Sequence, residues 1–298
     1  MRKIVTGLVY FFMIICFVLS LSSCEENKRK KESTNELYTN NEISKDNEKS
    51  KDNEESKGIV STGLLFELDE DNPYYIVTGI GKCTDSKVIV PAEYDGLPVK
   101  EIGSRAFQDC TSFSEMVLPN SIIRIQSRAF DDCDSLQKIT LSDTLQTIGA
   151  YAFAGTGLKT IALPDSLREI AECAFLSCRN LEEVKIPANI KYIRNSCFSC
   201  CESLSSVILP EGLLTIEAGA FNECVALTEI VLPDSLQKLN GFYGTSLQSI
   251  VIPKNVMVVH SSTFKNSNDL MTIYNYSSKS LAHLKENLNS SCVILDMN

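Results

Sequence analysis

The 298-residue sequence contains no tryptophan and only two histidines, and it is poor in the residues that mark fibrous or unfolded chains. Nine prolines and fourteen glycines are too few for a collagen-like or low-complexity protein. Lys and Arg number 28 against 38 Asp and Glu, and a net charge of −10 argues against a nucleic-acid partner. Hydrophobic residues make up 44% of the chain, which is enough for a folded core.

The one long apolar run lies at the start of the chain, which excludes a multi-pass membrane protein. Residues 4–21 follow the basic pair Arg2 and Lys3 and end in Leu21-Ser22-Ser23-Cys24. This arrangement resembles a bacterial lipoprotein signal with its lipobox, in which the cysteine becomes the first mature residue and carries the lipid. We therefore expect a signal peptide at residues 1–23 and lipidation of Cys24. An uncleaved membrane anchor is the alternative.

Residues 24–58 form a charged stretch in which Leu37, Tyr38 and Ile43 are the sizeable apolar side chains. So few apolar groups cannot offset the entropy of ordering the chain, which predicts a disordered tether. The basic run at residues 28–31 fits a nucleic-acid or lipid-headgroup site. The glutamates beside it and its position just after Cys24 favour a solvated stretch near the membrane instead.

Phenylalanines recur throughout the remaining chain at intervals of 21 to 23 residues, at Phe107, Phe130, Phe153, Phe175, Phe198, Phe221, Phe242 and Phe264. An isoleucine stands five residues before six of them, and an apolar phrase that often ends in proline follows each one. A period of this length with this apolar spacing is typical of a leucine-rich repeat solenoid.

The apolar phrase of each unit alternates with a period of two, as a β-strand does, and its proline ends the strand. Neighbouring strands are expected to form a parallel sheet on one face of the solenoid. Short helical turns carrying the phenylalanines, together with loops, are expected to form the other face. The predicted strand centres are Val88, Met116, Ile139, Ile161, Val184, Val207, Ile230, Ile250 and Ile273.

The repeat phrases resemble a known family. The pattern Ile125-x-x-x-Ala129-Phe130-x-x-Cys133-x-x-Leu136 and the turn at residues 232–236 are similar to the BspA-like, or Treponema pallidum-type, leucine-rich repeat of bacterial surface proteins. Membership implies a cell-surface antigen or adhesin that binds a protein ligand such as a host matrix protein. With the lipid site, it implies an extracytoplasmic, surface-exposed protein anchored to the bacterial cell membrane or outer membrane.

The two ends of the repeat region depart from the pattern and are expected to act as caps. Residues 59–101 would form an N-terminal cap with the first strand unit, including an extra loop at 92–99, and residues 102–276 the leucine-rich repeats. Residues 277–298 would form a C-terminal cap, with an amphipathic helix over 277–288 and a strand over 292–295.

Twelve cysteines are the unusual feature of the composition. Five of them stand three residues after a repeat phenylalanine, at Cys110, Cys133, Cys178, Cys201 and Cys224, where a buried thiol would pack as a small apolar group. A disulfide remains the alternative, either between neighbouring repeats at Cys178, Cys201 and Cys224 or among Cys173, Cys197 and Cys200. A zinc site is disfavoured because Cys-x-x-Cys occurs only at Cys197 and Cys200, without a second pair or a nearby histidine. We expect no metal and no other cofactor.

The sequence gives little support for catalysis. His260 and Ser262 lie near Asp269, but no nucleophile-elbow motif accompanies them and His260 occupies an ordinary repeat position. No glycine-rich phosphate loop is present. We expect a protein that is not an enzyme and has no catalytic residues.

Strand alternation predicts where a partner would bind, because the residues on either side of each strand centre face the solvent. In the row after the centres, Ile208, Val231, Val251 and Tyr274 would form an apolar strip that docks a protein. Two alternatives stay open. The β-branched side chains could simply pack along the ladder, and the protein could be a structural or self-associating component of the cell envelope.

Overall fold

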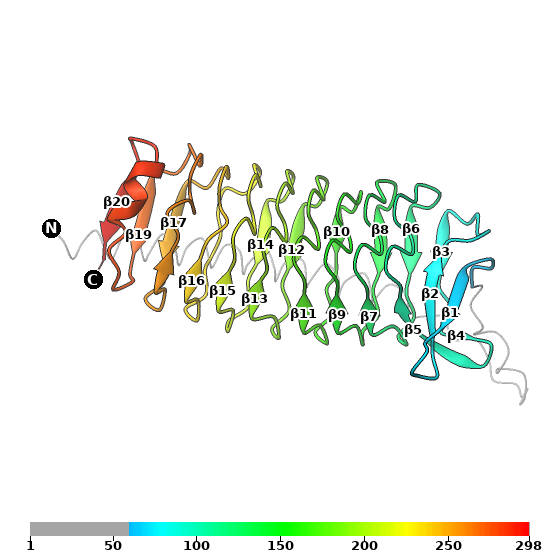
Figure 1. Ribbon diagram of the computed structural model, residues 1–298. Coiled ribbons are helices and arrows are strands. Elements are labelled where there is room, and N and C mark those ends of the chain that lie inside the picture. The colour runs from blue at the N-terminus through cyan, green and yellow to red at the C-terminus, as the bar shows by residue number, and fades with distance from the viewer. Residues whose placement is uncertain (1–59, 298) are drawn as a thin grey trace, which may run out of the picture. The chain divides into compact units, whose positions relative to one another are not determined.

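The computed structural model describes residues 60–297, which form a mostly β solenoid of about ten turns with little helix (Figure 1). The predicted signal peptide, Cys24 and the tether lie outside the described residues. Each turn is one sequence repeat, so the predicted solenoid is confirmed. Every turn contributes short strands that pair in parallel with the turns before and after it, and its apolar side chains fill the interior.

The predicted strands form one side of the solenoid, here called the first ladder. Their centres are buried and the residues beside them are mostly exposed, as in the pattern exposed-buried-exposed of β12. The first ladder consists of β3 (Lys87–Ile89), β6 (Glu115–Val117), β8 (Lys138–Thr140), β10 (Thr160–Ile161), β12 (Glu183–Lys185), β14 (Ser206–Ile208), β17 (Ser249–Ile252), β19 (Thr272–Asn275) and β20 (Val293–Asp296). It is divided into the sheets β3-β6-β8, β10-β12-β14 and β17-β19-β20.

The strand predicted around Ile230 does not form. Ile230 is buried as expected, but residues 227–233 have no strand assignment, and β14 is not hydrogen-bonded to β17 within the described chain. The unit from Phe221 to Phe242 is the shortest in the sequence, with its two phenylalanines 21 positions apart. The first ladder is interrupted at this turn, as it also is between β8 and β10.

A second ladder of strands, which the sequence interpretation missed, runs along the solenoid beside the first (Figure 1). Most of its strands have two residues and end on the apolar residue that precedes the phenylalanine, as in Ile125 and Ile148, and those side chains are buried. The second ladder consists of β5 (Leu97–Ile102), β7 (Arg124–Ile125), β9 (Thr147–Ile148), β11 (Glu169–Ile170), β13 (Tyr192–Ile193), β15 (Thr215–Ile216), β16 (Lys238–Leu239) and β18 (Val258–Val259). It is interrupted once, between β11 and β13.

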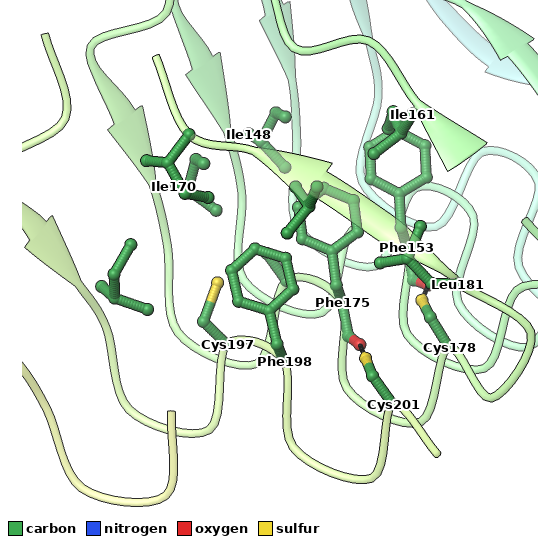
Figure 2. Close-up of a cluster of buried hydrophobic side chains, with 14 of the residues drawn as sticks. Ile148, Phe153, Ile161, Ile170, Phe175, Cys178, Leu181, Cys197, Phe198 and Cys201 are labelled. Carbon is green, nitrogen blue, oxygen red and sulfur yellow. Dashed lines mark hydrogen bonds between the residues drawn. The ribbon is translucent and has the colours of Figure 1, made fainter. Parts of the chain in front are cut away.

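The phenylalanines form a continuous stack inside the solenoid. Consecutive rings from Phe107 to Phe264 are nearly parallel, with centroids 5.2 to 6.1 Å apart. All eight side chains are buried. Figure 2 shows the middle of this stack, where Phe153, Phe175 and Phe198 lie beside buried isoleucines of the second ladder.

The wall that carries the phenylalanines consists of successive tight turns instead of the predicted helical turns. Around Phe130, two residues adopt left-handed backbone conformations, Arg128 with φ of 59° and Asp132 with φ of 57°. The N–H groups of Arg128, Phe130 and Asp132 donate to carbonyls of the next repeat, while Asp131 and Cys133 donate within their own turn. A helix would direct all of these N–H groups along its own axis, so this wall is a third hydrogen-bonded ladder.

Both ends of the repeats carry atypical elements. At the N-terminal end, β1 (Leu65–Leu68) pairs antiparallel with β2 (Tyr75–Gly79), and β2 pairs parallel with β5. The extra loop is a hairpin in which β4 (Glu93–Tyr94) pairs with β5. The predicted C-terminal helix is only the 3₁₀ helix η2 (Ala282–Asn287), with Leu281 and Leu284 buried. The strand expected after it is β20, paired with β19.

Candidate protein-binding face

The four residues of the predicted apolar strip lie on the outer face of the first ladder. Ile208 ends β14 with 57% of its surface exposed, and Val231 is 85% exposed. Val251 in β17 and Tyr274 in β19 are half-buried and are direct cross-strand neighbours. Strand pleating explains the shared orientation, because the residues between the exposed rows point into the core.

The interruption of the first ladder places Val231 at the most exposed point of this strip. A continuous ladder would use the backbone N–H groups of Leu209 and Thr228 to bond the neighbouring turns. Within residues 60–297, neither group donates a backbone hydrogen bond. Packing along the ladder explains why Val251 and Tyr274 are apolar, because the two side chains cover each other in part. It does not account for Val231, whose side chain is almost fully exposed to water.

The strip continues onto β20, one strand beyond the four residues predicted from the sequence. Leu295 in β20 is the cross-strand neighbour of Tyr274 and is 41% exposed. The apolar run at residues 292–295 was the signal that could have found it, since the strand itself was expected. The apolar strip therefore comprises Ile208, Val231, Val251, Tyr274 and Leu295.

The cysteines three residues after the phenylalanines are hydrogen-bond donors as well as core side chains. The thiols of Cys133, Cys178, Cys201 and Cys224 donate to the backbone oxygen of the preceding repeat's phenylalanine at 2.8 to 3.2 Å. Figure 2 shows two of these contacts, from Cys178 to Phe153 and from Cys201 to Phe175. The sequence interpretation treated these thiols only as small apolar groups.

Hydroxyl side chains occupy the same position in the repeats that lack a cysteine there. Thr156 and Thr245 donate to the phenylalanine oxygen of their own repeat, and Ser267 donates to the oxygen of Phe242 at 2.7 Å. A thiol or hydroxyl thus follows every repeat phenylalanine by three residues. That regularity was visible in the sequence and would have predicted a donor.

All ten cysteines in residues 60–297 are free thiols, including Cys173, Cys197 and Cys200. Burial raises the pKa of the Cys133 and Cys224 thiols to about 12. They stay protonated at physiological pH and act as donors instead of nucleophiles. Within the same residues, no group of three or more His, Cys, Asp or Glu side chains could hold a metal ion.

The two histidines contact different parts of the chain. His260 Nδ1 lies 3.0 Å from Ser262 Oγ, and within the described chain Asp269 makes no hydrogen bond to the ring. His283 Nε2 contacts the backbone oxygen of Val259 at 2.9 Å, which ties η2 to the second ladder. The described residues therefore do not assemble a Ser-His-Asp arrangement.

Parallel ladders, a buried ring stack and an open sheet face define this protein as a leucine-rich repeat solenoid, a non-catalytic class of fold that generally serves protein interaction. The sequence pattern of the BspA type leucine rich repeat region matches residues 100–217 and 191–297, in six copies. The chain belongs to this family, whose members are typically cell-surface proteins. Comparison with curated proteins gave no match. Within residues 60–297, no helix is long and apolar enough to cross a membrane.

Solved structures share this fold. A leucine-rich repeat protein from Bacteroides ovatus is 22% identical, with a TM-score of 0.53 over 80% of this chain and 78% of its own. A leucine rich cell surface protein from Faecalibacterium prausnitzii is 26% identical, with a TM-score of 0.56 over 74% of this chain and 55% of its own. A leucine-rich repeat protein from T. pallidum is 29% identical over 55% of this chain and 88% of its own, with a TM-score of 0.46.

Proposed function

We propose that this protein is a lipid-anchored bacterial cell-surface protein whose repeat domain binds a protein partner, such as a host matrix protein, through the apolar strip, and performs no catalysis. The observation that carries the proposal is the exposed pair Ile208 and Val231 on neighbouring turns of an open sheet face. Soluble domains seldom leave neighbouring apolar side chains in water unless a partner covers them. The anchoring proposal rests on the lipobox-like segment that ends at Cys24.

Replacing Ile208 and Val231 together by lysine should lower partner binding at least tenfold, because two charges would have to be desolvated in the interface. The measurement is binding of immobilised full-length protein to purified host matrix proteins and to the cell's envelope fraction. Thr140→Lys with Ala162→Lys is the matched control, since both residues are exposed in the same row of the first ladder. Equal binding by the two double variants would refute the role of the strip.

Cys24→Ser should abolish incorporation of a labelled fatty acid and move the protein out of the membrane fraction, because serine lacks the thiol that the lipid requires. Cys16→Ser changes a cysteine inside the predicted signal peptide and should leave both properties intact. Labelling and cell fractionation of the two variants provide the measurement. Retention of the label in Cys24→Ser would exclude Cys24 as the lipid site.

A self-associating component of the cell envelope is the second candidate. The apolar strip runs onto β20, and β20 has a strand partner on one side only within the described chain. An open edge beside exposed apolar side chains is a site where a second copy can pair. This candidate predicts concentration-dependent oligomers in sedimentation and loss of those oligomers in the Ile208→Lys, Val231→Lys variant.

A further inference from the structure

The segment that carries Ile208 and Val231 contains acidic residues and no basic ones. Residues 195–237 hold six carboxylates and not a single Lys or Arg, although the whole chain has 28 basic residues. The six are Glu202, Glu211, Glu217, Glu223, Glu229 and Asp234. Charge is therefore segregated along the solenoid, and the negative segment coincides with Ile208 and Val231.

Three of these carboxylates border the strip. Glu229 and Val231 are both exposed on either side of the buried Ile230, which places them on the same face. Glu211 and Asp234 are exposed in the turns that directly follow the segments carrying Ile208 and Val231. The apolar strip is thus edged by negative charge at the interruption of the first ladder, whereas the cross-strand neighbour of Ile208 on β12 is the exposed Lys185.

The carboxylates that border the strip differ from the other acidic residues of this segment in their ion pairs. Glu202 and Glu217 pair with Arg179 and Arg194 from neighbouring repeats, at 3.3 and 3.1 Å. Within residues 60–297, Glu211, Glu229 and Asp234 form no ion pair. The same residues form no metal-binding cluster, so a bound ion does not explain the carboxylates.

Resting on the proposed function of the strip, we propose that its partner is a cationic amphipathic protein segment, with apolar side chains flanked by Lys or Arg. Such a segment would cover Ile208 and Val231 and place its basic groups against Glu211, Glu229 and Asp234. Complementary charge at an interface speeds encounter and rejects wrong partners, and it acts over about 10 Å at moderate salt. An acidic protein or an anionic lipid surface would be repelled by the same carboxylates.

Two synthetic peptides test this inference with purified full-length protein. One alternates leucine with lysine, and the other replaces each lysine by glutamate. Fluorescence anisotropy should show that the lysine peptide binds at least tenfold more tightly and that its affinity falls as salt rises. Binding of the lysine peptide should weaken about tenfold when the three carboxylates are neutralised together, because three exposed ion pairs are lost. The triple variant is Glu211→Gln, Glu229→Gln and Asp234→Asn.

The repeat symmetry supplies a matched control. The control variant removes the same number of charges from equivalent positions of earlier repeats, through Asp143→Asn, Asp165→Asn and Glu115→Gln. It should bind the lysine peptide as well as the wild type does. Suppose that both peptides bind equally and that the Ile208→Lys, Val231→Lys variant binds neither. The strip is then the binding site, and the cationic partner is refuted. If neither peptide binds, or if the strip variant binds as well as the wild type, the strip proposal fails too.

Discussion

Phe198→Ala is expected to lower the free energy of unfolding by about 3–5 kcal/mol, the range for removing a buried aromatic ring. Phe198 is fully buried, and its ring stacks between Phe175 at 5.2 Å and Phe221 at 5.6 Å. Removing the ring leaves a cavity and deprives both neighbours of a stacking partner. Because each repeat contacts only its neighbours, one lost ring weakens two interfaces of the solenoid.

Chemical denaturation followed by circular dichroism measures this loss. Tyr192→Ala is the control, since Tyr192 belongs to the same turn but is 43% exposed on the second ladder. Its removal should cost well under about 1 kcal/mol. Similar losses in the two variants would contradict a stability that depends on the ring stack. A domain with a stability of about 5–15 kcal/mol would lose a large share of it in Phe198→Ala.

Cys201→Val should lower the free energy of unfolding by about 1–3 kcal/mol, because valine lacks the thiol donor and is larger than cysteine in a close-packed core. The Cys201 thiol is buried and donates to the backbone oxygen of Phe175 at 3.2 Å. Valine removes the donor and leaves that oxygen without its side-chain partner in the core. The Phe175 oxygen keeps its bond from the Cys178 N–H at 3.3 Å, so the cost combines one lost hydrogen bond with the strain of a larger side chain.

Cys201→Ser separates the two roles of the thiol. Serine keeps the donor, and Ser267 shows that a hydroxyl fits the equivalent position, where it bonds the oxygen of Phe242 at 2.7 Å. We expect Cys201→Ser to be less destabilising than Cys201→Val in the same denaturation experiment. The reverse order would show that these cysteines act only as small apolar groups.

The first ladder could be predicted because its strands carry their own signal. The phrase around Val184, for example, alternates apolar and charged residues and ends in proline, and β12 lies there. The second ladder has no such signal. A two-residue strand such as β7 is too short to show alternation, and its single buried Ile125 fits a strand, a turn or a helix equally well.

The apolar strip followed from the same alternation, so the exposure of Ile208 and Val231 could be predicted from the sequence. What could not be predicted was the interruption at residues 227–233, because Ile230 keeps the apolar pattern of a strand and is buried like one. Hydrogen bonds between turns depend on the register of both neighbours. The register is set by the stacking of the turns, so the sequence of a single repeat does not determine it.

The interruptions of the two strand ladders have offset positions. Between β11 and β13 the second ladder is open, but β12 and β14 of the same two turns are hydrogen-bonded in the first. Across residues 227–233 the first ladder is open, but β13, β15 and β16 remain paired in the second. At each of these interruptions, the other strand ladder still joins the same two turns by backbone hydrogen bonds. Separating any two successive turns of this region therefore requires breaking strand pairing.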